Sequence, residues 1–306
     1  MKHELSILIP VYNYSCIDLI HNLCRQAQQL STQGLVFEVI VAEDGSTNEE
    51  SLAANAVIAS LPHCRYLPFK QNVGRAAIRN LLAQESRYEW LLFLDCDMQL
   101  PGDNFLLTYI QHEGADVIDG GFGVTEQPQL LNRNLRYSYE WTEQANHSAS
   151  QRRQHPYRSF RTTNFMISRN VMMANHFDER FRHYGYEDVM FGKKLRQQGI
   201  TIAHIDNPMM LSDNETNLEF VEKTEEALRT LHQFRDDLRG YSRLLTLVDG
   251  IHVGLVRSAI RLGHRLAGPL ERRNLCGNHP RLMVFKLYKL GYYLTLTDND
   301  HKQLIK

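Results

Sequence analysis

Two aspartates follow a short apolar run, and their type and spacing suit the binding of a divalent cation. Asp95 and Asp97 come directly after residues 90–94, a run that predicts a buried strand. Residues two apart at a strand end emerge on the same side, so both carboxylates can face one ligand. Mg²⁺ and Mn²⁺ prefer carboxylate oxygens, and substrate phosphates commonly complete a Mg²⁺ shell. The structural alternative is a pair of turn-forming, helix-capping aspartates ahead of Pro101.

Polar residues also follow two earlier apolar runs. Tyr12 comes after the run at 5–11, and Glu43 and Asp44 come after the run at 37–42. Like charges gathered at one edge repel each other, so carboxylates collected there require an offsetting charge. A bound cation is the expected partner.

Strand-like and helix-like segments alternate along the first hundred residues. A weaker strand is expected at 65–69, and helices are expected at 17–30, 52–61 and 73–84. This alternation predicts a parallel sheet with helices on both faces. Ligands of such sheets bind outside the carboxyl ends of the strands, which is where the acidic residues stand.

Composition narrows the class of protein. The chain has 306 residues, of which 43% are hydrophobic and 23% charged, and a formal net charge of -1, which does not favour nucleic acid as the main partner. Its five cysteines form no C-x-x-C pair and indicate neither a disulfide framework nor a zinc site. No signal peptide or membrane span is recognisable, so we expect a cytoplasmic protein.

Five segments, in order, resemble the motifs of glycosyltransferase family 2. They are LSILIPVYN at 5–13, EVIVAEDGS at 38–46, NVGRAAIRN at 72–80, LFLDCD at 92–97 and YGYEDVMFG at 184–192. The resemblance implies the α/β GT-A fold, which has a Rossmann-like, mainly parallel central sheet flanked by helices. It implies a GT-A domain over 1–235, with a nucleotide-sugar half at 1–100 and an acceptor half at 101–235. A helical region at 236–306 follows.

The resemblance assigns donor-binding roles to the first three motifs. Pro10 and Tyr12 would lie against the nucleobase, where an aromatic ring offers stacking. Asp44 would accept hydrogen bonds from the base, usually uracil, and Glu43 stands where many relatives have aspartate. Arg79 would point towards the diphosphate, for which a guanidinium is suited. The alternative for Arg79 is a solvated helix arginine.

The resemblance assigns metal binding and catalysis to the last two motifs. Asp95 would contact the ribose or the metal, and Asp97 would ligate the metal that bridges to the pyrophosphate. Asp188 would be the general base that takes the acceptor hydroxyl proton, and Glu187 would bind the acceptor beside it. Adjacent carboxylates at a helix start can also be favoured by the helix dipole alone.

The sequence departs from the family pattern at the metal site. Many relatives carry a metal-binding histidine shortly before a segment like that at 215–223, and Leu211 occupies this slot. His204 is the nearest histidine upstream, and a single histidine at a strand end is more often structural. The third metal ligand therefore stays open.

The expected function is transfer of a sugar, with inversion, from a nucleotide diphosphate donor to a hydroxyl of a glycan or lipid-linked glycan. The donor is expected to be UDP-linked and the cofactor Mn²⁺ or Mg²⁺. The alternative is a degenerate GT-A domain that binds nucleotide or glycan without turnover. Nucleotidyltransferases, dehydrogenases and P-loop NTPases are disfavoured because their glycine-rich phosphate loops are absent.

Other segments carry weaker expectations. Residues 143–154 are expected to form a mobile loop, 160–165 to line the acceptor side and 218–245 to form one long helix. In the last helical region, one face carries Leu255, Ala259, Leu262 and Leu266, and the other faces carry Arg257, Arg261, His264 and Arg265. Such a helix can rest on the inner face of a membrane, or its leucines can pack on the catalytic domain or on a second subunit of a homodimer.

Overall fold

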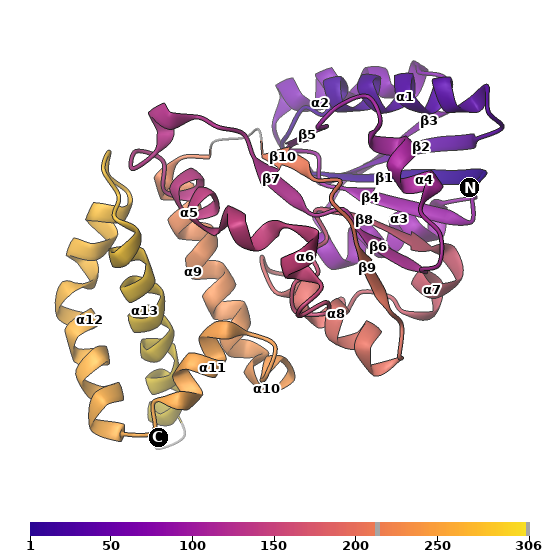
Figure 1. The fold of residues 1–306 in the computed structure, drawn as a ribbon. Helices are drawn as coiled ribbons and strands as arrows, with labels where there is room; N and C mark the ends of the chain where they lie inside the picture. The colour runs from indigo at the N-terminus through magenta and orange to yellow at the C-terminus, as the bar shows by residue number, and fades with distance from the viewer. Residues whose placement is uncertain (212–214, 304–306) are drawn as a thin grey trace. The chain divides into compact units, whose positions relative to one another are not determined.

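The computed structural model describes residues 1–211 and 215–303, with side chains described up to residue 297. The chain forms two compact units (Figure 1). Unit 1 contains Met1–Thr125, Ala145–Arg182 and Phe191–Asp213. Unit 2 contains Glu126–Gln144, His183–Met190 and Asn214–Lys306.

A mixed sheet in the order β3-β2-β1-β4-β8-β6-β9 forms the centre of unit 1. Each neighbouring pair is parallel except for the two pairs that β8 makes. The mainly parallel sheet predicted from the sequence is therefore confirmed, and the apolar runs at 5–11, 37–42, 65–69 and 90–94 all lie in strands. The strands are β1 Glu4–Val11, β2 Val36–Asp44, β3 Cys64–Phe69, β4 Trp90–Leu94, β6 Val117–Asp119, β8 Asn164–Ser168 and β9 Ile202–His204.

Helices cover both faces of this sheet because parallel strands are apolar on both sides. Helix α1 (Ile17–Ser31) buries an apolar stripe that includes Leu19, Leu23 and Ala27. The helix expected at 52–61 begins earlier and ends in a 3-10 turn. The other helices are α2 Glu49–Ala56, η1 Val57–Ser60, α3 Arg75–Glu85, α4 Phe105–Gln111, η3 Gln144–His147, α6 Ala149–Arg152, α7 Arg169–Ala174 and α8 Glu187–Gln197.

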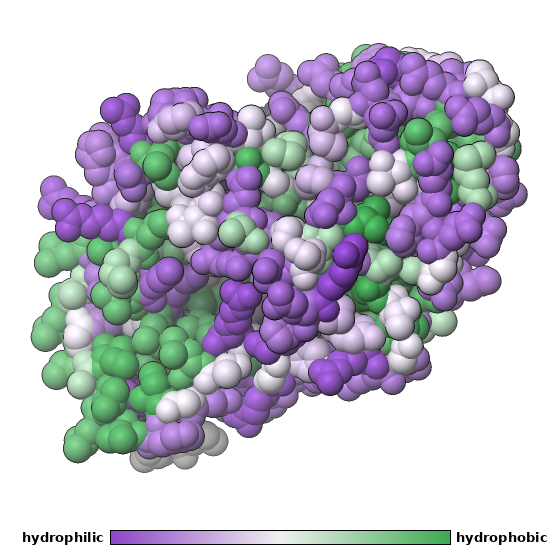
Figure 2. Space-filling view, in the orientation of Figure 1, coloured by the Kyte–Doolittle hydropathy of each residue, from purple (hydrophilic) through white to green (hydrophobic). Residues whose placement is uncertain are grey.

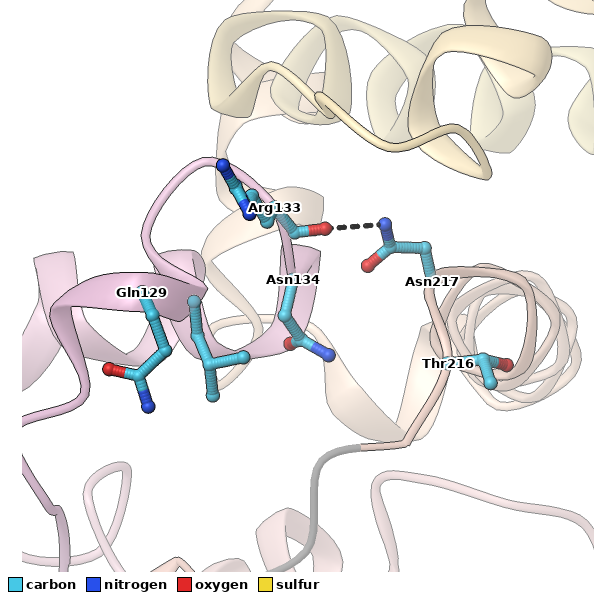
Figure 3. A pocket seen from close by; sticks show the side chains of 6 residues that line it. Gln129, Arg133, Asn134, Thr216 and Asn217 are labelled. Atoms are coloured by element: carbon cyan, nitrogen blue, oxygen red, sulfur yellow. Dashed lines mark hydrogen bonds between the residues drawn. The ribbon is translucent and has the colours of Figure 1, made fainter.

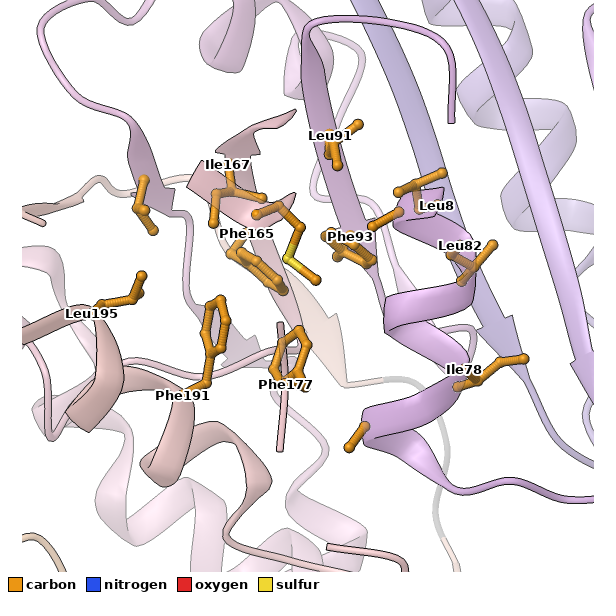
Figure 4. Packing of buried hydrophobic residues seen from close by; sticks show 14 of the residues in the cluster. Leu8, Ile78, Leu82, Leu91, Phe93, Phe165, Ile167, Phe177, Phe191 and Leu195 are labelled. Carbon is orange, nitrogen blue, oxygen red and sulfur yellow. The ribbon is translucent and has the colours of Figure 1, made fainter. Parts of the chain in front are cut away.

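An aromatic core fixes β4, β8 and α3 relative to one another (Figure 4). Phe93 of β4 stacks on Phe165 of β8, with 4.9 Å between ring centroids. Phe177 stacks on Phe191 at 4.1 Å in the same cluster, and Ile78 of α3 is buried there as well. Because protein cores are close-packed, this cluster holds the strand and the helix that carry the candidate site residues.

A small second sheet in the order β5-β10-β7 completes unit 1. Strands β5 (Met98–Gln99) and β10 (Met209–Leu211) pair antiparallel, while β10 and β7 (Phe122–Val124) pair parallel. Leu211, in the slot where relatives carry histidine, pairs with Met98 and Val124. The segment directly after the D-x-D motif is thus hydrogen-bonded to the strand that ends at Leu211.

Unit 2 is helical, which confirms the expected C-terminal helices. Its elements are η2 Pro128–Leu130, α5 Leu135–Glu143, α9 Asn217–Gln233, α10 Arg235–Leu238, α11 Arg243–Gly250, α12 Gly254–Leu275 and α13 Leu282–Gln303, together with the start of α8. The residues of its core come from α5, α9, α12 and α13, and they are Leu135, Val221, Leu275, Phe285 and Tyr288. No helix in residues 1–211 or 215–303 is both long and apolar enough to cross a membrane.

Two expectations for the middle of the chain are wrong. The segment 218–245 is not one helix, because the chain leaves α9 at Phe234 and turns at Gly240, which has a φ of 82°. Ser242 then begins α11 by accepting a hydrogen bond from the Leu245 amide. The segment 143–154 is not an irregular loop, because it contains η3 and α6, and Arg152 within it is buried.

Candidate active site

The turns that follow β1 and β2 are tied together by one asparagine. Asn13 adopts a φ of 53°, and its side-chain oxygen accepts hydrogen bonds from the amides of Thr47 at 2.7 Å and Asn48 at 3.0 Å. Its own amide donates to the Ser46 hydroxyl at 2.8 Å. The neighbouring Tyr12 side chain is 51% exposed. The Tyr12 ring is therefore accessible for stacking on a ligand, beside the turns that Asn13 joins. Pro10, near the end of β1, is partly buried.

Glu43 lies beneath these turns. It is 1% exposed, and its carboxylate accepts hydrogen bonds from the Ser46 hydroxyl and from Asn55 Nδ2, the latter at 2.7 Å. Asn55 is itself fully buried and also donates to the Tyr14 carbonyl at 2.8 Å. In this position Glu43 supports the turn from below, and its direct contact with a nucleotide stays a prediction.

Asp44 joins the end of β2 to the start of α3. Its two carboxylate oxygens accept hydrogen bonds from the amides of Val73 at 2.7 Å and Gly74 at 3.1 Å. Asn72 Nδ2 donates to the Asp44 carbonyl at 2.9 Å. Burial raises the pKa of the Asp44 carboxyl, and the two backbone hydrogen bonds oppose this shift. The carboxylate is therefore oriented before any ligand arrives.

Glycine is required at two points of this junction. Gly45 has a φ of 67°, and a Cβ there would lie 2.3 Å from the Asn72 amide nitrogen. Gly74, the residue before α3, has a φ of 89°, and a Cβ there would lie 2.9 Å from the Arg182 carbonyl oxygen. Only glycine combines this backbone conformation with such close approach.

Arg79 of α3 is buried against the D-x-D motif. Its side chain is 1% exposed, and its Nη2 donates to Asp95 Oδ1 at 2.8 Å. The guanidinium also lies 5.8 Å from the centre of the Phe177 ring, within the range of a cation–π contact. The alternative that Arg79 is a solvated helix arginine is wrong. Its charge instead offsets the carboxylate at the end of β4.

The next residue, Asn80, fastens α3 to the segment at 177–179. Asn80 Oδ1 accepts from the Phe177 amide at 2.9 Å, and Asn80 Nδ2 donates to the Phe177 carbonyl at 3.0 Å and to Glu179 Oε1 at 2.8 Å. Sequence reasoning missed this role, since the partners are 97 and 99 residues away. The Arg-Asn pair thus holds the D-x-D strand on one side and a distant loop on the other.

The two carboxylates of the D-x-D motif lie close to the thiol between them. The pKa of Cys96 is raised by burial and by the charges of Asp97, Cys16 and Asp95. Within residues 1–211 and 215–303, no three His, Cys, Asp or Glu side chains gather in a way that could hold a metal ion. A cation here would depend on the two aspartates together with oxygens of a bound phosphate. This is the usual mode for Mg²⁺, and the donor set fits it.

His204 is held inside unit 1 by a buried ionic cluster. Its Nδ1 lies 3.0 Å from Asp119 Oδ2 and 3.0 Å from Arg152 Nη1, and its Nε2 lies 3.0 Å from the Pro156 carbonyl oxygen. His204, Asp119 and Arg152 are all buried. The structural interpretation of this histidine is confirmed. Leu211 is buried and apolar, so neither residue supplies a third metal ligand.

The turn before α8 belongs to unit 2 and is held by α9. Gly185 has a φ of 97°, and Tyr186 has a φ of 70°, which is uncommon for a bulky residue. The Tyr184 amide donates to Glu226 Oε1 at 3.2 Å, and the Tyr184 carbonyl accepts from the Thr230 hydroxyl at 3.0 Å. Two hydrogen bonds from the Tyr184 backbone to α9 therefore hold the strained turn that leads into the Glu-Asp motif.

The two carboxylates of that motif differ in exposure. Glu187 is 6% exposed, whereas Asp188 is partly exposed. Asp188 Oδ1 accepts a hydrogen bond from the Val189 amide at 2.7 Å, so its carboxylate is oriented at the N-terminus of α8. Unit 1 brings together the other predicted site residues, which are Pro10, Tyr12, Glu43, Asp44, Arg79, Asp95 and Asp97.

Unit 2 also has a small polar pocket (Figure 3). Asn217 Nδ2, on its wall, donates to the Arg133 carbonyl at 2.8 Å. The pocket is lined by Gln129, Leu130, Arg133, Asn134, Thr216 and Asn217. None of the residues predicted to take part in donor binding or catalysis lies in it.

Comparison with known proteins identifies the family. Residues 6–174 match the family model described as glycosyl transferase family 2. The chain belongs to this family. Among curated relatives of this glycosyltransferase family 2 member, a chondroitin synthase from Escherichia coli is 27% identical over 241 residues, which are 67% of this chain and 34% of the relative. A hyaluronan synthase from Pasteurella multocida is 27% identical over 253 residues, which are 70% of this chain and 26% of the relative.

Solved structures show the same fold. S. aureus TarS 1-349 has a TM-score of 0.52 and 16% identity, with 98% of this chain and 92% of that chain covered. The mannosyltransferase PcManGT from Pyrobaculum calidifontis, solved with GDP-Man and Mn²⁺, has a TM-score of 0.54 and 11% identity, with coverage of 96% and 86%. The chain spans only about a third of the chondroitin synthase and about a quarter of the hyaluronan synthase. The GT-A fold expected from the sequence is confirmed.

Proposed function

We propose that this chain transfers a sugar, with inversion, from a nucleotide diphosphate donor to a hydroxyl of a glycan or lipid-linked glycan. The observation that carries the proposal is the set of Tyr12, Asp44, Asp95 and Asp97 at the carboxyl ends of β1, β2 and β4. Arg79 of α3 forms an ion pair with Asp95 beside them. Family membership supports it, and so do the names of the relatives, which are synthases of sugar polymers. The division into a donor half at 1–100 and an acceptor half at 101–235 belongs to the same proposal.

The donor is expected to be a UDP-sugar. S. aureus TarS 1-349 has itself been solved with UDP and with UDP-GlcNAc, which supports this expectation. The exposed ring of Tyr12 provides a stacking surface for the base. Asp44 is already oriented by two amides, and a carboxylate has lone pairs left to accept from the base. The expected pairing is with the N–H of a uracil ring.

The site is expected to work with Mn²⁺ or Mg²⁺. Such a cation would be held by Asp97 and Asp95 and would stabilise the negative charge of the departing nucleoside diphosphate. The protein contributes a second positive charge through Arg79, whose ion pair keeps Asp95 in place. Asp95 is thereby positioned, and no third protein ligand is assigned among the described residues.

Asp188 is the proposed general base. A hydroxyl that attacks the anomeric carbon must lose its proton, and a partly exposed carboxylate fixed at the start of α8 can take it. Glu187 is the proposed acceptor-binding neighbour. A single displacement with one base inverts the anomeric configuration, and no nucleophile for a double displacement is assigned.

The substitution Asp188→Asn tests the proposal. It removes the base but keeps the shape of the side chain, so transfer from UDP-sugars should fall about a thousandfold. Affinity for UDP with Mn²⁺, measured by calorimetry, should stay within about twofold because donor contacts lie in other motifs. The matched control is Asp236→Asn, since Asp236 is an exposed acidic residue of the same unit. Full transfer activity in Asp188→Asn would show that the assigned base is wrong.

The second candidate is a degenerate domain that binds a nucleotide without turnover. Leu211 in place of the usual histidine favours it. Incubation of the protein with UDP-sugars and Mn²⁺ separates the two, because a transferase releases UDP slowly by hydrolysis of the donor. Absence of UDP release across all donors that bind would support the degenerate domain.

A further inference from the structure

The solvent side of α12 is apolar. Leu255 is 82% exposed, Leu262 58%, Leu266 74% and Leu270 69%. These leucines recur at spacings of seven, four and four residues, which places them on one face of a helix. In Figure 2 the hydrophobic colour gathers over the region of α12 and α13. We call these four leucines the leucine face.

The inner side of α12 buries Gly268 and the core residue Leu275, and it also carries charged side chains. His264 Nδ1 lies 2.9 Å from Glu271 Oε2, and Arg272 Nε donates to Glu225 of α9 at 2.9 Å. Gly291 of α13 packs so closely that a Cβ there would lie 2.6 Å from His264 Cβ. The four leucines of the leucine face therefore do not pack on the helices of their own unit. Large contiguous apolar surfaces of this kind mark interaction sites.

Basic residues surround the leucine face. Between positions 254 and 297 the sequence contains eight Lys or Arg residues and one Glu, although the whole chain has a net charge of -1. Arg265 and Arg273 of α12 and Lys286 of α13 are exposed. The neighbouring helix adds the exposed apolar residues Met283, at 69%, and Leu287, at 54%. Apolar and cationic groups thus occur together on this hairpin.

We infer that the α12–α13 hairpin binds the surface of a membrane that contains anionic lipids. Leucines can enter the boundary between headgroups and acyl chains, while arginines and lysines stay among the phosphates. A second copy of the chain is a poorer occupant, because it would bring its own Arg265, Arg273 and Lys286 against the same exposed cations. The inference is independent of the transfer reaction. A membrane surface would simply keep the enzyme where lipid-linked acceptors are found.

Flotation of the 306-residue chain with vesicles tests the inference. One set contains phosphatidylcholine alone, and the other contains equal amounts of phosphatidylcholine and phosphatidylglycerol. Binding is expected only to the anionic set, and it should weaken as salt screens the charges. The double variant Leu262→Ser/Leu266→Ser should bind at least about tenfold more weakly, because it removes two exposed apolar groups. The double variant Arg265→Gln/Arg273→Gln should lose about fivefold per charge.

Matched controls separate a surface effect from misfolding. Val57→Ser changes an apolar residue of unit 1 that is 50% exposed, and Arg158→Gln changes an exposed arginine of unit 1, so both should bind vesicles as the wild type does. All variants should melt at the wild-type temperature. The inference is overturned if the wild type binds neither set, or if the leucine variant binds as well as the wild type. It is also overturned if sedimentation shows a dimer that the leucine variant abolishes, since a second copy would then cover the leucine face.

Discussion

At the scale of single residues, the charge balance of the D-x-D motif is set partly by the protein itself. The sequence suggested that a bound cation offsets the carboxylates at the sheet edge. The structure adds Arg79, which is buried and lies 2.8 Å from Asp95. Of the two aspartates in the motif, Asp97 is therefore the stronger candidate for a metal ligand, because Asp95 already forms an ion pair with Arg79. Because the described residues hold no group of three possible metal ligands, strong metal binding is expected only when a diphosphate is present.

The substitution Asp97→Ala tests that dependence on the diphosphate. UDP affinity in the presence of Mn²⁺ should fall at least about tenfold, because the protein loses its principal ligand to the ion. UDP affinity in EDTA should be the same for variant and wild type. Calorimetry with and without Mn²⁺ measures both values. Asp103→Ala is the control, since this aspartate is 76% exposed. An unchanged Mn²⁺ effect in Asp97→Ala would remove Asp97 from the metal site.

The substitution Arg79→Gln tests the ion pair. It leaves Asp95 without its buried cation, so unfolding should become easier by about 2–3 kcal/mol, given that Asp95 is 17% exposed. Urea denaturation measures this change. Arg79→Lys, which keeps the charge but loses the planar fork, should recover only part of it. A variant Arg79→Gln as stable as the wild type would mean that the pair contributes nothing to the fold.

At the scale of elements, the sequence predicted what local patterns determine and missed what distant contacts determine. The run at 90–94 is apolar throughout, and the run at 5–11 is apolar except for Ser6 and Pro10, so they identified β4 and β1 closely. The end of α9 was missed because apolar periodicity continues past Phe234, and only the positive φ of Gly240 shows the chain turning away. The burial of Arg152 was missed because polar neighbours surround it in sequence.

The same logic applies to the candidate site. The motif residues Asp44, Asp95 and Asp188 were predicted from the resemblance of their segments to family motifs. The supports around them were not, since the partners of Asn13 and Asn80 lie in other turns. An asparagine placed just after a strand, as Asn13 is, or buried within a helix, as Asn80 is, can indicate a side chain that holds a neighbouring turn. It becomes useful only once the topology is known.

The buried ionic cluster gives a prediction for α6 and β9. Replacing Arg152 by methionine leaves Asp119 buried beside His204 without its cation, so stability should fall by about 3 kcal/mol. Thermal or urea unfolding measures the loss. The control is Arg158→Met, because Arg158 is exposed. His204→Gln should likewise lower stability but leave the Mn²⁺ dependence of UDP binding unchanged. A changed Mn²⁺ dependence would make His204 a metal ligand after all.

At the scale of the whole molecule, the chain passes between its two units several times. The segments Glu126–Gln144 and His183–Met190 belong with the C-terminal helices, although each is flanked by residues of unit 1. Sequence patterns can divide a chain only into consecutive segments, so the predicted boundary between the GT-A domain and the helical region lies at residue 235. These patterns had no way to show that two short internal segments join the last ninety residues, because that requires contacts far apart in sequence.

Unit 2 contains a lysine that makes stability depend on pH. Burial lowers the pKa of Lys289 from 10.5 to about 8, against the opposing charges of Glu140 and Glu143. Its ammonium lies 4.7 Å from the Tyr139 ring centre and 4.5 Å from that of Phe285. Since the folded state binds this proton less tightly than the unfolded state, burial destabilises the protein below pH 8. That penalty disappears as the pH rises from about 8 to 10.5.

Replacing Lys289 by methionine tests this dependence. The variant should be more stable than the wild type at pH 7, by up to about 3 kcal/mol, and the difference should shrink at pH 10. Urea midpoints at the two pH values measure both effects, and comparison with the variant cancels the titration of other groups. Lys286→Met is the control, because Lys286 is exposed on the same helix. If the stability difference between Lys289→Met and the wild type were the same at pH 7 and pH 10, the lowered pKa of Lys289 would be wrong.

The reversed direction of β8 has a consequence for how such an enzyme can diversify. Leu94 pairs with Asn164, and the Asp95 amide donates to the Thr163 carbonyl at 2.9 Å. The residues just before β8, and not those just after it, therefore lie beside the D-x-D motif. In the stretch just ahead of Thr163, Phe160 and Thr162 are buried, whereas Arg161 is exposed. Beside the motif, the exposed position 161 can therefore change at little cost, while its two neighbours must keep side chains that fit the core.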